Sequence, residues 1–331
     1  MPEPIFTTQR WRLYVFGLFY VFTRILKRRN WKKLDSFIAT HVVSDYHYFQ
    51  AKYALNSRIW ICPRHTVGRH VLRYGIYEPV TSFLIERFVR NGFSFIDIGA
   101  NVGTHTILAA KSRSGSNPQR IVAFEPLPST YQVLLENCRL NDLDNVESIM
   151  AAVSDHAGVG VIVQLASDPA LVMTVENTSS SNSPVDDQCV YVNLDDFCAD
   201  TGWVEPTVVK IDVQGFEPRV FRGAHRAFGQ MSELMVVFEI DVPWLKRAGF
   251  TLNDLQASVN ELKFDRMFVL DEKEGGVQKL NPEQIVTIFA DQRRYSNVLA
   301  VKGRMAQTLL DEYIQQLPNL PANLQPRAQP S

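Results

Sequence analysis

Charged side chains follow three buried apolar runs in the central part of the sequence. The segments read FSFIDIGANVG, IVAFEP and TVVKIDVQGFE, and the charged residues of interest are Asp97, Glu125, Lys210 and Asp212. Charges beside core strands cost free energy unless they are paired or used. Because open α/β sheets bind ligands at the carboxyl ends of their strands, we expect these side chains to gather at one edge of a sheet.

The first of these segments has the pattern of a strand that turns tightly into a helix. Gly99 and Gly103 lack a Cβ, so the backbone can approach a small ligand that a larger residue would exclude. The helix expected from Thr104 would direct its first amides into the same crevice. Such a turn also occurs without a ligand, but that alternative weakens once Glu125 is considered.

Glu125 follows the turn by about twenty residues, where a doubly wound sheet places the carboxylate that accepts both ribose hydroxyls of an adenosine cofactor. A dinucleotide site would have the pattern G-x-G-x-x-G, whereas here residue 101 is asparagine. This register favours S-adenosylmethionine, which has no phosphate and whose amino acid end Asp97 and the loop amides could hold. A nicotinamide-cofactor oxidoreductase on a similar sheet is the alternative enzyme.

The chain resembles the FkbM-type S-adenosylmethionine-dependent methyltransferases. The similar segments run in order from YGIYEP at Tyr74 to SNVLAVK at Lys302, with DIGANVG, AFEPLP, AAVSD, VNLDDF, KIDVQGFE and VVFEID between them. The resemblance implies O-methylation of a hydroxyl on a glycan, a glycolipid or a related secondary metabolite. It does not identify the acceptor.

The cofactor residues that we carry over from the family pattern are Asp97, Gly99, Asn101, Gly103 and Glu125. Three further residues are expected at the same site. Glu78, together with Tyr77, would fold over the methionine end, although Glu-Pro is also a common helix start. Ala152 would line the adenine face, where only a small residue leaves room.

Methyl transfer to a hydroxyl requires the acceptor oxygen to lie behind the methyl group and to lose its proton. We expect Asp212 to act as the base or as a metal ligand. Lys210 would tune or orient it, because an adjacent ammonium stabilises a charged carboxylate. Glu217 would bind acceptor hydroxyls, or else complement the dipole of the helix that it begins.

A metal ion is a weaker alternative for activating the acceptor. Glu239 and Asp241 could join Asp212 around Mg²⁺, which prefers hard oxygen ligands, but no sequence pattern supports such a site. Several histidines occur before residue 81, yet none forms an H-E-x-x-H pattern. His105 is a minor candidate for the base, and a hydrogen-bonded helix residue is the simpler interpretation.

The elements that must position these residues alternate between strand and helix, which predicts a Rossmann-like, doubly wound, mostly parallel sheet. The family resemblance implies that this sheet is of the methyltransferase type. Expected strands lie near residues 93–98, 121–124, 146–151, 208–212 and 234–239; expected helices lie near 104–111, 129–140, 218–228 and 253–262. Residues 159–196 read as a β insertion, and within it the polar stretch 177–187 is either a lid or an ordinary loop.

We expect three parts along the chain. They are a mostly helical N-terminal extension (1–70), the methyltransferase domain (71–304), and a C-terminal helix end with a proline-rich tail that we expect to be disordered from Gln315 (305–331). At 331 residues and 46% hydrophobic, the chain can bury a three-layer core. Four scattered cysteines without a C-x-x-C pair argue against zinc and fit a reducing cytoplasm.

The N-terminal segment is basic and aromatic. Residues 1–33 contain eight lysines and arginines against Glu3, while the whole chain has a net charge of -1, which gives no overall attraction to nucleic acid. The uncharged stretch 13–23 is far shorter than the ~20 residues of a transmembrane helix, and it lacks a signal cleavage site. Residues 10–33 would therefore form either a peripheral helix at the inner membrane face or a helix that packs on the domain. A membrane-bound, non-catalytic adapter is the alternative from a different functional class.

Overall fold

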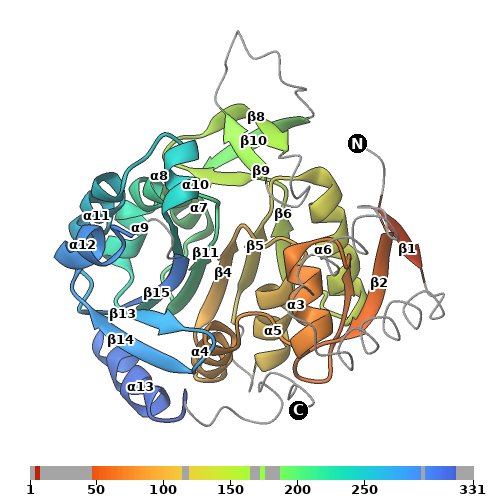
Figure 1. The fold of residues 1–331 in the computed structure, drawn as a ribbon, viewed down its shortest axis with the longest axis horizontal. Coiled ribbons are helices and arrows are strands. Elements are labelled where there is room, and N and C mark those ends of the chain that lie inside the picture. The colour runs from red at the N-terminus through yellow and green to blue at the C-terminus, as the bar shows by residue number, and fades with distance from the viewer. Residues whose placement is uncertain are drawn as a thin grey trace.

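The chain folds around an eight-stranded mixed sheet (Figure 1). The computed structural model describes residues 4–7, 47–113, 119–164, 172–175, 187–291 and 295–317. The strand order is β14-β13-β15-β12-β11-β4-β5-β6. The strands are β4 (Ser94–Ile98), β5 (Ile121–Phe124), β6 (Val146–Ile149), β11 (Thr207–Ile211), β12 (Leu234–Asp241), β13 (Arg266–Asp271), β14 (Gly276–Leu280) and β15 (Tyr295–Lys302).

The five strands from β6 to β12 are parallel, and β15 enters antiparallel between β12 and β13. The chain order reverses direction between β4 and β11, so their carboxyl ends form the switch point at which such sheets bind ligands. The predicted Rossmann-like sheet is therefore confirmed. All five strands expected from the sequence are present in this sheet, with ends that differ from the expected ones by at most two residues.

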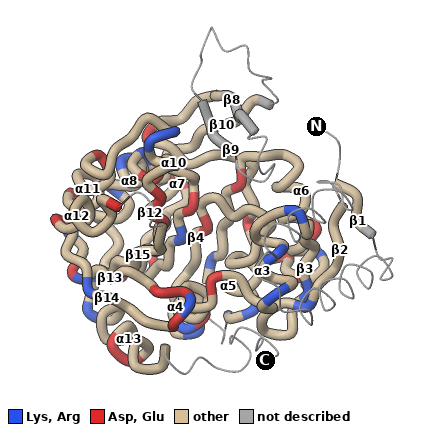
Figure 2. Tube along the Cα trace, viewed as in Figure 1, with Lys and Arg blue, Asp and Glu red and all other residues tan. Residues whose placement is uncertain are grey.

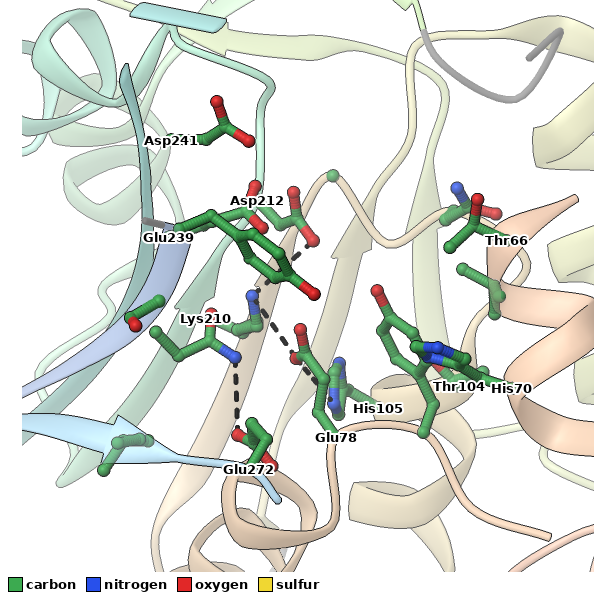
Figure 3. A pocket seen from close by; sticks show the side chains of 18 of the residues that line it. Thr66, His70, Glu78, Thr104, His105, Lys210, Asp212, Glu239, Asp241 and Glu272 are labelled. Atoms are coloured by element: carbon green, nitrogen blue, oxygen red, sulfur yellow. Dashed lines mark hydrogen bonds and ion pairs between the residues drawn. The ribbon is translucent and has the colours of Figure 1, made fainter. Parts of the chain in front are cut away.

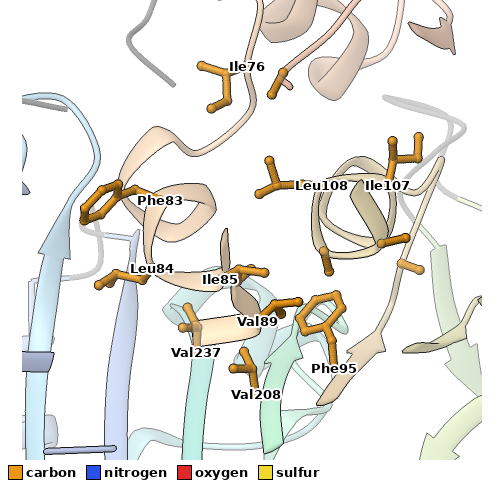
Figure 4. Close-up of a cluster of buried hydrophobic side chains, with 14 of the residues drawn as sticks. Ile76, Phe83, Leu84, Ile85, Val89, Phe95, Ile107, Leu108, Val208 and Val237 are labelled. Atoms are coloured by element: carbon orange, nitrogen blue, oxygen red, sulfur yellow. The ribbon is translucent and has the colours of Figure 1, made fainter. Parts of the chain in front are cut away.

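Helices cover both faces of the sheet. One face carries α4 (Pro79–Arg90), α5 (Thr104–Ser112), α6 (Pro128–Leu140) and α13 (Arg304–Ile314). The other carries α7 (Leu194–Thr201), α8 (Glu217–Gly223), α9 (His225–Gln230) and α11 (Leu252–Glu261). Neighbouring residues of one strand point to opposite faces, so Phe95 packs with the first set, as Figure 4 shows, and Ile96 with the second. Shorter elements are α3 (Thr66–Tyr74), α10 (Val242–Arg247), η1 (Pro282–Gln284) and α12 (Ile285–Ile288).

A three-stranded sheet precedes the eight-stranded sheet along the chain. It consists of β1 (Ile5–Thr7), β2 (His47–Lys52) and β3 (Arg58–Ile61). The expectation of mostly helical structure is wrong for residues 47–61. Asn137 of α6 and Asn141, the C-cap of that helix, explain the difference, because their side chains donate to and accept from the backbones of Trp60 and Arg58 at distances of 2.5–3.2 Å. They complete the edge of β3 as another strand would.

A second sheet, in the order β7-β10-β8-β9, confirms the predicted β insertion. Its strands are β7 (Ala152–Ser154), β8 (Gly158–Gln164), β9 (Val172–Val175) and β10 (Asp187–Asn193). The strand expected over 146–151 is shorter, because the chain leaves the main sheet after Ile149 and continues into β7. Residues 8–46, which include the basic segment 10–33, and residues 176–186 of the polar stretch lie outside the described residues.

The single helix expected over 218–228 is two helices that meet at Ala224. Gly223 is the last residue of α8 and packs closely on the insertion, because a Cβ at this position would lie 2.0 Å from the carbonyl oxygen of Ser154. Helix α8 therefore ends where it packs directly on the backbone next to β7. Arg222 strengthens this contact by donating to Asp155 at 3.0 and 3.1 Å.

The C-terminal part of the described chain packs on the core beyond α13. Leu317 is buried and belongs to the same apolar cluster as Phe83 and Leu310. The expectation of disorder from Gln315 is therefore wrong for residues 315–317, because one leucine in a proline-rich segment is enough to fix it against an apolar surface. None of the described helices has the length and apolar character needed to cross a membrane.

Candidate active site

A cavity of about 1430 Å³ opens at the carboxyl ends of β4, β5, β11 and β12. Nine of the residues that line it are acidic and two are lysines, and among the described lining residues there is no arginine. Figure 2 shows acidic segments around β4, α4 and α5. The lining thus suits a neutral or cationic ligand and offers no arginine for a phosphate.

The glycine turn after β4 is held against the end of β11. Gly99 has a φ of +82°, and a Cβ there would meet the carbonyl oxygen of Asp212 at 2.0 Å. Asn101 is also left-handed, with a φ of +52°, and its side-chain oxygen accepts from the amide of Val102 at 2.7 Å. Gly103, with a φ of +86°, is the N-cap of α5 and does not line the cavity. The glycines therefore place the turn, and Asn101 and Gly99 face the cavity.

Glu125 joins this turn to the end of β5. Its carboxylate is buried and accepts hydrogen bonds from the amides of Asn101 at 2.9 Å and Leu127 at 3.0 Å. Burial raises the pKa of Glu125 to about 7, although both hydrogen bonds act in the opposite direction. Each carboxylate oxygen keeps a further lone pair for a ligand in the cavity.

A pH dependence of cofactor binding follows from the raised pKa of Glu125. As the pH falls through about 7, the carboxylate takes up a proton and loses its capacity to accept two hydroxyl donors. We expect affinity for S-adenosylhomocysteine to fall in the same range, measured by calorimetric titration between pH 5.5 and 8.5. The Glu125→Gln variant should bind more weakly and without this pH step. A step of unchanged size in that variant would assign the titration to another group.

Asp97 lies at the end of β4 and is buried. Its carboxylate accepts from the hydroxyl of Thr106 on α5 at 2.6 Å, which ties the strand to the following helix. Burial raises the pKa of Asp97 to about 6, while the hydroxyl of Thr106 and the charge of Lys210 lower it. Asp97 therefore braces the turn, and it also lines the cavity.

Lys210 lies at the centre of the cavity floor, and its side chain is 1% exposed. The ammonium is 3.7 Å from the Glu78 carboxylate and 3.7 Å from the Asp212 carboxylate (Figure 3). Burial alone lowers the pKa of Lys210, but the carboxylates around it, Glu78 first and Asp212 second, outweigh burial and raise that pKa above its ordinary value. A charged ammonium thus holds two carboxylates in place between β4 and β12.

Asp212 follows β11 and has a side chain that is 22% exposed to the cavity. Besides the Lys210 contact at Oδ2, its Oδ1 accepts from the side-chain amide of Gln214 at 3.1 Å. Glu239 of β12 lies beside Asp212 and Lys210 in Figure 3. Burial, and then the charge of Asp212, raise the pKa of Glu239 well above its ordinary value. Asp212 is therefore a partly exposed carboxylate on this rim of the cavity.

Glu78 is the N-cap residue of α4 and has a left-handed φ of +45°. Its carboxylate lies 3.5 Å from Nε2 of His105 as well as near Lys210. Burial, and then the charge of Lys210, lower the pKa of His105 to about 3. His105 is thus neutral near pH 7 and too weakly basic to be a good general base.

Of two further predicted residues, Glu217 lies outside the cavity and Ala152 lines it. Glu217, the first residue of α8, does not line the cavity, and its carboxylate accepts from the amides of Val213 at 3.2 Å and Gly215 at 3.3 Å. Burial raises the pKa of Glu217 to about 7. This carboxylate braces the loop after Asp212 and does not reach an acceptor. Ala152 does line the cavity, next to Ala151 and Val153.

The structure offers little for the Mg²⁺ alternative. Within the described ranges, no three His, Cys, Asp or Glu side chains gather closely enough to hold a metal ion. Asp241 accepts from the amide of Trp244 at 3.1 Å and so caps α10. Figure 3 shows it apart from the carboxylates around Lys210.

Other lining residues escaped the sequence analysis. Glu272 lies in the turn between β13 and β14, and burial followed by the charge of Glu78 raises its pKa to about 7. Tyr295 begins β15, and it is paired in register with Asp241 across the sheet. No motif marks Glu272, which stands in the charged, glycine-rich stretch DEKEGG. Tyr295 directly precedes the SNVLAVK segment.

A family model for the methyltransferase FkbM domain matches residues 97–268, which is just over half of the chain. The chain belongs to the FkbM methyltransferase family. It is therefore an S-adenosylmethionine-dependent methyltransferase, and the oxidoreductase alternative is not supported. No curated protein matches the chain.

Solved structures of methyltransferases are similar to this FkbM-family chain at low identity. An FkbM methyltransferase from Methylobacillus flagellatus KT is 15% identical over 63% of this chain and 43% of that one, with a TM-score of 0.36. An O-methyltransferase from Bacillus cereus in complex with SAH is 12% identical over 68% and 81%, also with a TM-score of 0.36. A precorrin-6y C5,15-methyltransferase from Geobacter metallireducens GS-15 is 14% identical over 67% and 86%, with a TM-score of 0.34.

The residues of the FkbM-family site fit the chemistry of S-adenosylmethionine. The carboxylate of Glu125 has free lone pairs beside the glycine turn, as ribose hydroxyls require. The excess of carboxylates in the cavity suits a cationic sulfonium and amine. Of the residues predicted to bind the cofactor, those that line the cavity are Glu78, Asp97, Gly99, Asn101, Glu125 and Ala152.

Proposed function

We propose that this methyltransferase transfers the methyl group to a hydroxyl oxygen of a glycan, a glycolipid or a related secondary metabolite. The observation that carries the proposal is the accessible carboxylate of Asp212 beside the buried ammonium of Lys210. A hydroxyl must lose its proton as the new bond forms, and a positioned carboxylate can accept it.

S-adenosylmethionine supplies the electrophilic methyl group, and the chain supplies the rest. Asp212 accepts the proton from the acceptor hydroxyl as its oxygen becomes bonded to the methyl carbon, and the bond from that carbon to sulfur would break to leave S-adenosylhomocysteine. Lys210 stays charged and keeps the Asp212 side chain oriented toward the cavity. The glycine turn and Glu125 would hold S-adenosylmethionine, so that the acceptor oxygen meets the methyl carbon in line with the bond from that carbon to sulfur.

The charge of the cavity supports a neutral or cationic acceptor and disfavours nucleic acid. Nine acidic residues against two lysines would repel a phosphodiester backbone, which proteins bind mainly through lysine and arginine. The same argument disfavours uronic acids and phosphorylated sugars. We therefore infer an uncharged or amine-bearing polyol at the acceptor end.

The test is a methyl-transfer assay with methyl-labelled S-adenosylmethionine and matched acceptors. The panel contains neutral glycosides, their amino-sugar analogues and their uronic acid analogues. We expect labelled methyl ethers on neutral or amino sugars, identified by mass spectrometry and NMR, and little transfer to the uronic acids. Label on nitrogen or carbon would contradict O-methylation, and a preference for uronic acids would contradict the inferred acceptor charge.

A further inference from the structure

The N-terminus of helix α4 is capped by a residue from a distant part of the chain. An N-cap side chain usually accepts from amides of its own helix, but the Glu78 side chain makes no such bond. Instead, Glu272 accepts from the amides of Val80 at 2.8 Å and Thr81 at 3.1 Å. It also accepts from the Thr81 hydroxyl at 2.5 Å. The orphan donors of the first helical turn are thus satisfied from outside the helix.

Glu272 reaches α4 from the turn that follows β13, 192 residues further along the chain than Val80. Asn297 of β15 supports it by donating to Glu272 at 3.4 Å and to the Thr81 hydroxyl at 3.2 Å. Figure 3 shows this contact next to the Lys210 cluster. The turn, β15 and the start of α4 therefore meet at one point on the cavity wall.

This arrangement leaves the Glu78 carboxylate free for the cavity. Glu78 holds a left-handed φ of +45°, which a non-glycine residue adopts only when its surroundings impose it. In this conformation its carboxylate points away from α4 and lies 3.7 Å from the Lys210 ammonium. A Glu78 side chain that capped its own helix would not be available to Lys210.

We propose that Glu272 is a positioning residue, which caps α4 from the β13–β14 turn and thereby keeps the Glu78 carboxylate directed at Lys210 in the cofactor cavity. The proposal rests on the proposed function to the extent that it takes this cavity as the site of methyl transfer. It makes the β13–β14 turn, which lies outside the residues 97–268 that the family model matches, a determinant of ligand affinity.

The chain contains a matched control for the effect of losing such a cap. Glu233 accepts from the amides of Met305 at 3.2 Å and Ala306 at 2.8 Å, and so caps α13 from a distant segment in the same manner. Glu233 does not line the cavity. Glu233→Ala and Glu272→Ala should therefore destabilise the fold comparably, and only the second should affect the site.

The experiment measures thermal unfolding and calorimetric binding of S-adenosylhomocysteine for the full chain and its variants. We expect both alanine variants to lower the Tm, Glu272→Ala to weaken binding at least tenfold, and Glu233→Ala to change it less than twofold. Glu272→Gln, whose amide oxygen can still accept a backbone hydrogen bond, should recover part of the affinity. Equal affinities of the wild-type protein and Glu272→Ala would overturn the proposal.

A double variant tests whether Glu272 acts through Glu78. If it does, Glu78→Ala with Glu272→Ala should bind no more weakly than Glu78→Ala alone, whereas independent effects would multiply and refute the mechanism. Hydrogen exchange of the ligand-free protein measures directly how well the backbone amides of residues 74–81 are protected. Exchange there should become at least tenfold faster in Glu272→Ala and stay unchanged in Glu233→Ala. Unchanged exchange in Glu272→Ala would overturn the proposal, whereas failure of the wild type to transfer methyl would count against the proposed function alone.

Discussion

Replacing Asp212 by asparagine should lower turnover by roughly 10²–10⁴-fold, the usual contribution of a general base, and leave cofactor affinity within a few fold. The asparagine keeps the size of the side chain and can still accept from Gln214, but it cannot take up the proton of the acceptor hydroxyl. Single-turnover methyl transfer and calorimetric binding of S-adenosylhomocysteine would separate the two effects.

The control for this variant is Asp265→Asn. Asp265, like Asp212, lies next to the end of a strand. Its carboxylate accepts from the amide of Gly303 at 2.8 Å, and it does not line the cavity. It should retain wild-type turnover. An active Asp212→Asn enzyme would show that the base is another group, and Glu239 would then be the first residue to replace.

The sequence predicted the half of the site that depends on local chemistry. The turn at Gly99, the carboxylate of Glu125 and the strand with Lys210 and Asp212 each lie in one short segment, where residue types and spacing are constrained together. The topology rule then brings such segments to one edge of the sheet, and the structure has them there.

The other half of the site depends on contacts between distant segments, which a local sequence pattern cannot predict. Glu272 stands in a charged turn that reads as ordinary solvent-exposed sequence, and only the fold brings it to α4. For Glu217 the sequence left two alternatives open, a contact with acceptor hydroxyls or a carboxylate at the start of a helix. Glu217 does begin α8, and two backbone amides of the preceding loop bind its carboxylate.

The prediction of helical structure for residues 47–61 was wrong for the same reason, namely contacts with a distant segment of the chain. Strand β3 is short, and its edge is completed by Asn137 of α6 and by Asn141 at the end of that helix, which lie 77 and 83 residues further along the chain than their partners. Aromatic residues in this region suggested helical cover, because aromatic content alone does not distinguish a buried strand from a buried helix. Hydrogen bonds from Asn137 and Asn141 therefore favour a strand at β3.

Removing the Glu125 carboxylate by Glu125→Ala should weaken binding of S-adenosylhomocysteine by roughly 100-fold or more. Two hydrogen bonds to a charged acceptor contribute about 1.5–3 kcal/mol each, and tenfold in affinity corresponds to about 1.4 kcal/mol. The variant also leaves the amides of Asn101 and Leu127 without their acceptor, so the glycine turn should become less ordered. Both effects lower the affinity for S-adenosylhomocysteine, and they can be measured without knowing which molecule receives the methyl group.

Glu147→Ala is the matched control, because Glu147 is an exposed glutamate on β6, the strand beside β5, and does not line the cavity. It should bind S-adenosylhomocysteine as the wild type does. Glu125→Gln should fall between the two, since an amide oxygen can accept from one hydroxyl but carries no charge. If Glu125→Ala bound as tightly as Glu147→Ala, the ribose would have to lie elsewhere in the cavity, and the glycine turn would be a structural feature without a role in cofactor recognition.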